Sequence, residues 1–269
     1  MSSLLDRYER FAFDLDGTVW RSGRPLPGAI ATFERLRAAS RRVAFVTNSP
    51  ERSCAQVATQ LRSIGIAAHP DEVVTSGRAA AHFLTCRPVP ARTVYVIGGE
   101  GLIDDLEGTD LEVVDGAAGE RAGVVVVGRD GSCTYSMLKT AFRAVSAGAL
   151  FVGTNRDPTH PIVDGLEPGG GALVATIEYA SGIAATIVGK PEQATIELVD
   201  LALGPPGRTL VIGDKPETDL ETAHRAGWSG CLVLTGVTAP SDRIDPAPHH
   251  VLSSLDELVR EESAADGLR

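Results

Sequence analysis

Two carboxylates, Asp14 and Asp16, stand two residues apart at the end of an apolar run in the segment FAFDLDGT (residues 11–18). The apolar run predicts a buried strand, and the Gly-Thr pair predicts the loop that follows it. In open α/β sheets, ligands bind beyond the carboxyl ends of the strands. Asp14 and Asp16 are therefore candidate functional residues, although Asp-Gly is also a common turn dipeptide and Asp a common helix cap.

Three later apolar runs end on polar residues in the same way. They close on Thr47-Asn48-Ser49, on Gly189-Lys190-Pro191 and on Gly213-Asp214. The carboxyl ends of parallel strands lie at one edge of a sheet, so we expect these side chains to converge there with Asp14 and Asp16.

The four strand ends carry the residue types that attack on a phosphate monoester requires. Asp14 and Asp214 offer the hard oxygen ligands that Mg²⁺ prefers. The Thr47 hydroxyl, the Asn48 amide and the backbone N–H groups of the turn after them can donate to phosphoryl oxygens. Lys190 adds a positive charge that lowers the repulsion of an anionic nucleophile.

The two acids of the first segment differ in their expected roles. Asp14 can act as a nucleophile and form an aspartyl phosphate. Asp16 can protonate the leaving alkoxide and then remove a proton from water. Asp219, five residues after Asp214, either orients a metal-bound water or Lys190, or is an ordinary acid in the first turn of a helix.

Strand-like and helix-like segments alternate along the chain, which predicts βαβ units and a parallel, doubly wound sheet. The expected strands are 11–15, 43–47, 94–97, 124–127, 186–188, 210–212 and 232–234. The expected helices are 28–39, 53–63, 136–147, 171–181 and 192–203. No internal repeat is found.

The interval between Thr47 and Lys190 has strand and helix patterns of its own. We therefore predict two domains: a Rossmann-like core from residues 1–80 and 185–269, and an inserted α/β domain from residues 81–184. The junctions are expected near 79–84 and 182–185, and the tail from Glu261 to Arg269 is expected to be solvated.

The composition is that of an ordinary globular protein, with 43% hydrophobic and 22% charged residues. Thirty-five acidic against 25 basic residues give a formal net charge of −10. This surplus disfavours a nucleic-acid partner, which requires a basic surface. A phosphorylated small molecule remains compatible, because one bound divalent cation and one lysine can reverse the local charge.

Four scattered cysteines, Cys54, Cys86, Cys133 and Cys231, have neither disulfide-like nor zinc-like spacing. The N-terminal residues are too charged for a signal peptide, and no apolar run is long enough for a transmembrane helix. We expect a cytoplasmic protein with reduced thiols and no membrane partner.

The four strand ends are DLDGT, the segment at Thr47, the segment at Lys190 and GDKPETD. In this order they resemble the four motifs of the haloacid dehalogenase superfamily of aspartate-nucleophile phosphohydrolases, and the resemblance runs from about Phe11 to Leu255. The resemblance implies that Asp14 is the nucleophile and Asp16 the acid and base. It also implies that Thr47 and Lys190 bind phosphate. Mg²⁺ would be held by Asp14, Asp16 (through its carbonyl) and Asp214.

The long insertion is similar to the large α/β cap of the C2 type. That cap belongs to the class IIA branch of nucleotide-type, 4-nitrophenyl, phosphoglycolate and pyridoxal phosphate phosphatases. The similar stretches are 153–161 and 166–173, and their likeness implies that His160 contacts substrate; the alternative is a surface histidine beside two prolines. The branch also implies a homodimer formed through the cap. In the second motif, Thr47-Asn48-Ser49, many relatives carry a second Asn at the third position, where this chain has Ser49.

The sequence thus predicts a Mg²⁺-dependent phosphatase that acts on a small phosphorylated metabolite. Two alternatives stay open: a protein that binds such a metabolite without turnover, and a glycosyltransferase in which Asp14 and Asp16 hold a metal and a nucleotide sugar. In the second alternative, Lys190 and Asp214 would have no role.

Overall fold

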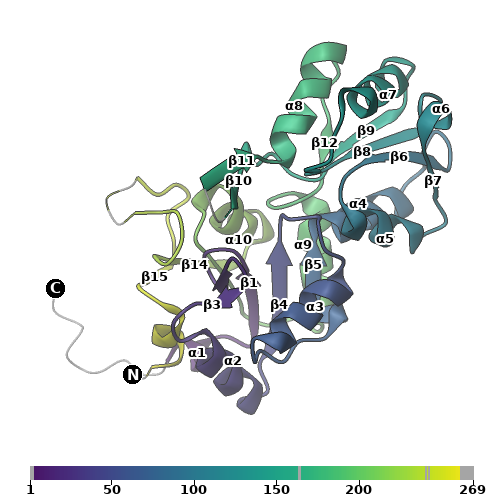
Figure 1. The fold of residues 1–269 in the computed structure, drawn as a ribbon. Coiled ribbons are helices and arrows are strands. Elements are labelled where there is room, and N and C mark those ends of the chain that lie inside the picture. Colours follow the sequence, from purple (N-terminus) through teal and green to yellow (C-terminus); the bar gives the residue numbers. More distant parts are fainter. Residues whose placement is uncertain (1–2, 163–164, 240, 242, 261–269) are drawn as a thin grey trace. The chain divides into compact units, whose positions relative to one another are not determined.

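The computed structural model describes residues 3–162, 165–239, 241 and 243–260 (Figure 1). By its internal contacts the chain divides into two compact units. The first comprises Met1–Val46, Ala58–Val73 and Val199–Arg269, and the second comprises Thr47–Val57 and Val74–Leu198. The predicted solvated tail from Glu261 to Arg269 lies outside the described residues.

The larger sheet has six strands: β1 (Arg10–Asp14), β4 (Arg42–Thr47), β5 (Val73–Thr75), β13 (Thr209–Gly213), β14 (Ser229–Val233) and β15 (His250–Leu252). Their order is β15-β14-β13-β1-β4-β5, and the neighbours from β15 to β4 pair in parallel. The order reverses beside β1, because the chain continues to β4 and β5 on one side and adds β13 to β15 on the other. Such a switch point is where open α/β sheets bind ligands.

The other large sheet has five strands: β6 (Thr93–Ile97), β7 (Glu112–Val114), β8 (Val124–Val127), β9 (Leu150–Gly153) and β12 (Thr186–Ile187). Their order is β12-β9-β8-β6-β7, and all pairs are parallel. Two short antiparallel hairpins join β2 (Trp20–Arg21) to β3 (Arg24–Pro25) and β10 (Thr159–Ile162) to β11 (Gly165–Pro168).

The helices are α1 (Leu4–Arg7), α2 (Ala29–Ala38), α3 (Cys54–Ser63), α4 (Ser76–Thr85), α5 (Glu100–Glu107), α6 (Gly116–Gly119), α7 (Tyr135–Ser146), α8 (Gly170–Ser181), α9 (Gln193–Leu203) and α10 (Glu221–Ala226). Single turns are η1 (Pro70–Glu72), η2 (Pro216–Leu220) and η3 (Leu255–Val259). Among these described helices, none has the length and apolarity that crossing a bilayer requires.

The core of the first unit is built on β1, whose Phe11 and Phe13 side chains are fully buried. Phe33 of α2 packs between Phe13 and Phe45, with ring centroids 4.8 and 5.1 Å away. Strands that are buried on both faces read as continuous apolar runs, which explains the run that ends at Asp14.

The core of the second unit lies between its sheet and two helices. Val125 and Val127 of β8 pack with Ala141 and Val145 of α7 and with Val174 of α8. The helix α7 has the apolar spacing of an amphipathic helix, and both helices bury apolar residues against the sheet.

The predicted parallel α/β fold is confirmed, and each of the five expected helices is present within one residue of its predicted limits. Several short elements were missed, among them β5, β7 and β15, because three residues are too few to show a periodicity. The expected junction at 79–84 lies inside α4. The predicted domain boundaries stay a prediction; the division by contacts assigns residues 47–57 and Lys190 to the second unit.

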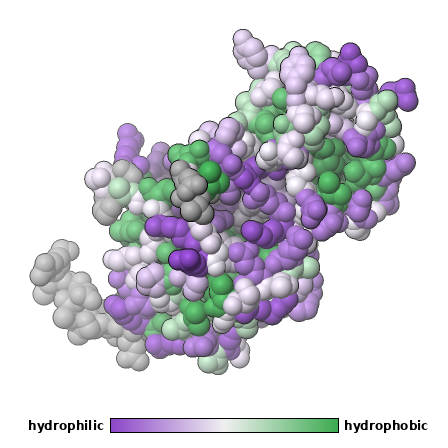
Figure 2. All heavy atoms as spheres, in the orientation of Figure 1, coloured by the Kyte–Doolittle hydropathy of each residue, from purple (hydrophilic) through white to green (hydrophobic). Residues whose placement is uncertain are grey.

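Figure 2 shows hydrophobic side chains gathered at the surface over the hairpin β10–β11. The large exposed hydrophobic residues of this hairpin are Ile162 and Leu166. The hairpin also carries His160, which pairs with Glu167 across the two strands.

Candidate active site

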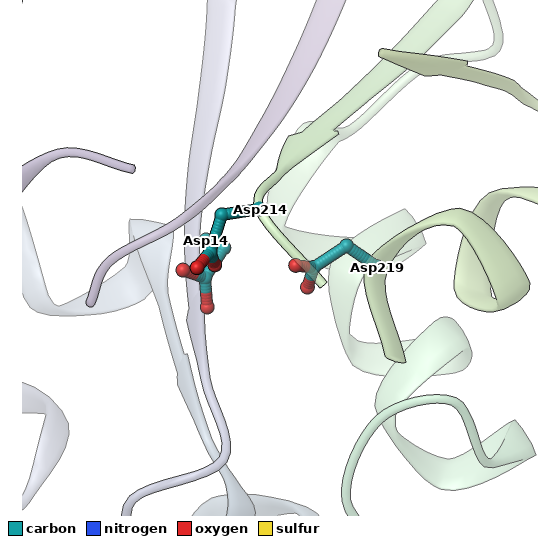
Figure 3. A group of neighbouring side chains, drawn as sticks. All are labelled: Asp14, Asp214 and Asp219. Atoms are coloured by element: carbon teal, nitrogen blue, oxygen red, sulfur yellow. The ribbon is translucent and has the colours of Figure 1, made fainter. Parts of the chain in front are cut away.

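Three carboxylates of the first unit converge at the switch point of the six-stranded sheet (Figure 3). Asp14 ends β1, Asp214 directly follows β13, and Asp219 lies in the turn η2. One oxygen of each lies within 4.8 Å of the others, and Asp214 and Asp219 are only 1% exposed. Ionised carboxylates at this separation repel one another, so a divalent cation is a suitable partner for them. The oxygen donor set fits Mg²⁺.

Strand register brings Asp14 and Asp214 together. Phe13 pairs with Ile212 between the parallel strands β1 and β13, so the two acids leave the sheet at the same edge. On the other side of β1, Asp14 pairs with Val46, the residue before Thr47. The pairing of β1 with β13 brings together two acids that are 200 positions apart in the sequence. No local sequence pattern encodes this pairing.

The segment 235–238, which the sequence analysis did not single out, positions Asp214. The backbone N–H of Val237 donates to Asp214 Oδ2 at 2.8 Å, and Thr238 Oγ1 donates to the Asp214 carbonyl at 2.5 Å. A Cβ atom at Gly236 would lie 1.8 Å from Asp214 Oδ2. The available signal was Thr235-Gly236 directly after the expected strand 232–234, a polar ending like the other four.

Gly17 approaches the same carboxylate from the loop after β1. Its φ of +90° is in the region that favours glycine, and a Cβ atom there would lie 2.6 Å from Asp214 Oδ2. Thr235 Oγ1 donates to the Gly17 carbonyl at 2.7 Å. Glycine is therefore favoured at position 17 for two reasons. Its positive φ forms the turn, and the lack of a Cβ atom leaves room for the Asp214 carboxylate.

Asp219 lies with Asp14 and Asp214 in the carboxylate group. Its predicted roles, either orienting a metal-bound water or Lys190 or being an ordinary acid in the first turn of a helix, stay predictions. Its Oδ2 atom accepts a hydrogen bond from the backbone N–H of Lys215 at 3.0 Å. This bond orients the side chain toward Asp14 and Asp214, as Figure 3 shows.

The Asp16 side chain is exposed, and the group of three carboxylates found among the described residues does not include it. Its Oδ1 atom accepts a hydrogen bond from the indole N–H of Trp20 at 2.9 Å. Trp20 is buried, so it orients the carboxylate from a rigid site. Trp20 lies only four residues after Asp16 but was not among the residues predicted from the sequence.

The expected phosphate ligands Thr47, Asn48, Ser49 and Lys190 all belong to the second unit, where Asn48 contacts Lys190. Asn48 Oδ1 accepts from the backbone N–H of Lys190 at 2.8 Å, and Asn48 Nδ2 lies 3.4 Å from its carbonyl oxygen. Thr47 Oγ1 accepts from the backbone N–H of Ser49 at 3.1 Å. The structure thus gives the Asn48 amide a partner other than a phosphoryl oxygen.

The Asn48 carbonyl is held by two further side chains of the second unit. Ser76 Oγ donates to it at 2.7 Å and Asn155 Nδ2 at 2.8 Å. Asn155 is buried and also accepts from the backbone N–H of Asp157 at 3.0 Å. Asn155 lies in the stretch 153–161, for which only His160 was predicted to have a role.

His160 lies in an ion-pair network of the second unit. Its Nε2 atom is 3.9 Å from Glu51 Oε2. Arg129 forms ion pairs with both Glu51 and Glu167, and burial lowers the pKa of its guanidinium from the usual value. The role of His160 toward substrate stays a prediction.

Comparisons with known proteins agree with these features. A family model described as haloacid dehalogenase-like hydrolase matches residues 11–112, and a HAD-hydrolase-like model matches residues 187–258. A D-glycerol 3-phosphate phosphatase of Mycobacterium tuberculosis is 36% identical over 248 residues, 92% of this chain and 69% of the relative. Chronophin of Mus musculus is 34% identical over 278 residues, 96% of this chain and 94% of the relative.

A solved structure is also similar over nearly the whole chain. The crystal structure of glycerol phosphate phosphatase from Mycobacterium tuberculosis in complex with magnesium has a TM-score of 0.89 and 35% identity. The match covers 96% of this chain and 78% of that one. The fold and the acids at its switch point define an α/β enzyme. The chain belongs to the haloacid dehalogenase-like hydrolase family, and it is a phosphatase of the class IIA branch.

Proposed function

We propose that this protein is a Mg²⁺-dependent phosphatase that hydrolyses a small phosphorylated metabolite through an aspartyl phosphate on Asp14. The observation that carries the proposal is the close group of Asp14, Asp214 and Asp219. A phosphatase needs both a nucleophile and a means of reducing the negative charge around the phosphoryl group.

The side chains of Asp14, Asp214 and Asp219 would hold the cation, together with the backbone carbonyl of Asp16. When bound, Mg²⁺ neutralises negative charge on the phosphoryl oxygens and helps to orient them. Val237 and Lys215 support this arrangement from the protein side, because their backbone N–H groups orient Asp214 and Asp219.

The reaction has two displacements at phosphorus. In the first, a carboxylate oxygen of Asp14 forms a bond to phosphorus while the bond to the leaving oxygen breaks, and Asp16 donates its proton to that oxygen. In the second, Asp16 takes a proton from water as the water oxygen attacks phosphorus. The acyl phosphate bond then breaks, which releases inorganic phosphate and regenerates Asp14.

The proposed phosphate ligands belong to the second unit. The Thr47 hydroxyl donates a hydrogen bond to a phosphoryl oxygen, and Ser49 belongs to the loop that binds the phosphoryl group. The Lys190 ammonium balances the negative charge of the phosphoryl oxygens. Asn48 acts on the substrate through Lys190, whose main chain it binds. His160 contacts the leaving group, and the second unit forms a homodimer with another copy.

The proposed substrates are small phosphate monoesters. A D-glycerol 3-phosphate phosphatase, an acid sugar phosphatase and a 5'-nucleotidase are among the relatives. Several of the matched relatives are phosphatases, which favours hydrolysis over non-catalytic binding and glycosyl transfer.

The decisive experiment measures phosphate release from 4-nitrophenyl phosphate and a panel of metabolites, with native protein and Asp14→Asn in parallel. We expect Mg²⁺-dependent turnover by the native protein, none after chelation by EDTA, and none by Asp14→Asn. Asp16→Asn should instead accumulate acid-trapped phosphoprotein, because hydrolysis of the intermediate becomes slow. Equal activity of native protein and Asp14→Asn would refute the assignment of the nucleophile.

A further inference from the structure

Three charged residues of the second unit that the proposed chemistry does not use form a network together with His160. Arg129 follows β8 and forms ion pairs with Glu51 and with Glu167 of β11. Glu167 pairs across the hairpin with His160, whose Nε2 atom is 3.9 Å from Glu51. We call these four residues the Arg129 network.

The three ion-paired residues of the Arg129 network are two carboxylates and one guanidinium. The Arg129 side chain is 14% exposed and its guanidinium already has a carboxylate on each side, while the Glu51 and Glu167 side chains are 35% and 31% exposed. The net charge of these three residues is −1. The two partly exposed carboxylates can accept further hydrogen bonds, and carboxylates accept but cannot donate.

The network lies beside the loop that carries the proposed phosphate ligands. Glu51 is two residues after Ser49, and Ser49 Oγ lies 3.5 Å from Glu51 Oε2. Arg129 follows Gly128, where a Cβ atom would lie 2.9 Å from the Pro50 side chain. All these residues belong to one unit, so this proximity is a property of that unit alone.

We infer that the Arg129 network selects phosphate esters with an uncharged, hydroxylated leaving group and rejects those whose leaving group carries a carboxylate. Hydroxyl groups donate to the Glu51 and Glu167 oxygens without disturbing the ion pairs. A substrate carboxylate is repelled by the same oxygens, and to reach Arg129 it must displace one of them and leave that carboxylate unpaired. This inference rests on the proposed phosphatase function.

The test compares glycerol 3-phosphate with 3-phosphoglycerate, which differ in a hydroxymethyl group against a carboxylate. We expect kcat/KM of the native protein to favour glycerol 3-phosphate by about tenfold or more. Where turnover is absent, the ratio is taken from the two inhibition constants against 4-nitrophenyl phosphate hydrolysis. Preference for 3-phosphoglycerate, equal values, or binding of neither compound would overturn the inference.

Charge-removing variants separate this role from a general effect. Glu167→Gln, and independently Glu51→Gln, should move the ratio toward 3-phosphoglycerate by about tenfold. Glu120→Gln is the matched control, because Glu120 is an ion-paired glutamate of the same unit, 2.7 Å from Arg143, outside the network. An unchanged ratio in both network variants would also overturn the inference.

Hydrolysis of the reference substrate 4-nitrophenyl phosphate distinguishes failure of the Arg129 inference from failure of the proposed phosphatase function. Hydrolysis of 4-nitrophenyl phosphate by native protein and variants shows that the phosphatase site is intact, so a wrong ratio then counts against the Arg129 network alone. Absence of Mg²⁺-dependent hydrolysis of any ester by native protein would count against the proposed function itself.

Discussion

The side-chain amide of Asn48 spans the main chain of Lys190, with Oδ1 accepting from its N–H at 2.8 Å and Nδ2 lying 3.4 Å from its carbonyl oxygen. The two residues are 142 positions apart in the sequence. A lysine stem is flexible, so its charge is placed accurately only if its backbone is held. Asn48 therefore acts as a positioning residue for Lys190.

Asn48→Asp should damage this arrangement, because an oxygen would replace the nitrogen that faces the Lys190 carbonyl. The new carboxylate would also face Asp157, whose Oδ2 atom lies 3.4 Å from Asn48 Nδ2. We expect a lower melting temperature from a loss of about 1–3 kcal/mol, and kcat/KM lower by about 10- to 100-fold. Gln56→Glu is the control, because Gln56 is exposed and its replacement still accepts from Ser53 N–H. Equal effects of the two substitutions would contradict the positioning role.

Gly236→Ala should move the Asp214 carboxylate. The added Cβ atom would lie 1.8 Å from Asp214 Oδ2, so either the side chain or the segment 235–238 must shift. We expect a higher Mg²⁺ concentration for half-maximal activity and a stability loss of about 1–3 kcal/mol. Gly131→Ala serves as the control, because nothing lies within 4 Å of a Cβ atom there. Metal titration and thermal unfolding would show both effects, and unchanged metal dependence would argue against this positioning.

Asp219→Asn should weaken Mg²⁺ binding more than it changes folding. The amide oxygen can still accept from the Lys215 N–H, but one negative charge of the group is lost. We expect the metal dissociation constant to rise by about 10- to 100-fold, measured by calorimetry or metal titration of activity. Glu217→Gln, an exposed acid of the same turn, should leave it unchanged.

The buried carboxyl group of Asp105 should make the stability of the protein depend on pH. Burial raises the pKa of this carboxyl from 3.8 to about 6, against the hydrogen bond from Thr75 Oγ1 at 2.9 Å. The folded state therefore favours the protonated form. The stability that this group contributes is fully present below about pH 4 and is lost as the pH rises through about 6.

Asp105→Asn stays neutral at every pH, so it should stabilise the protein near pH 8 by up to about 3 kcal/mol and have little effect near pH 4. Chemical unfolding at both pH values measures the difference. Glu107→Gln is the control, because Glu107 is an exposed acid of the same helix. A stabilisation equal at the two pH values would mean that the Asp105 proton is not responsible.

The sequence by itself determined the fold class, the family and the candidate acids. An apolar run that ends on Asp14 is a local pattern, and the same pattern before Thr47, Lys190 and Asp214 placed four candidate strand ends in order. The fold prediction succeeded because strand burial and helix periodicity are properties of neighbouring residues, and the family prediction succeeded through the resemblance of the four motifs.

The tertiary structure decided which of these residues meet and what holds them. Asp219 joins Asp14 and Asp214, segment 235–238 positions Asp214, and the Asn48 amide binds the Lys190 main chain. The sequence spacing predicts none of these contacts, because strand register and side-chain packing bring together residues that lie far apart in the chain. Local periodicity predicts where a strand ends. The residues that contact the side chain at that end are defined only by the folded structure of the unit to which it belongs.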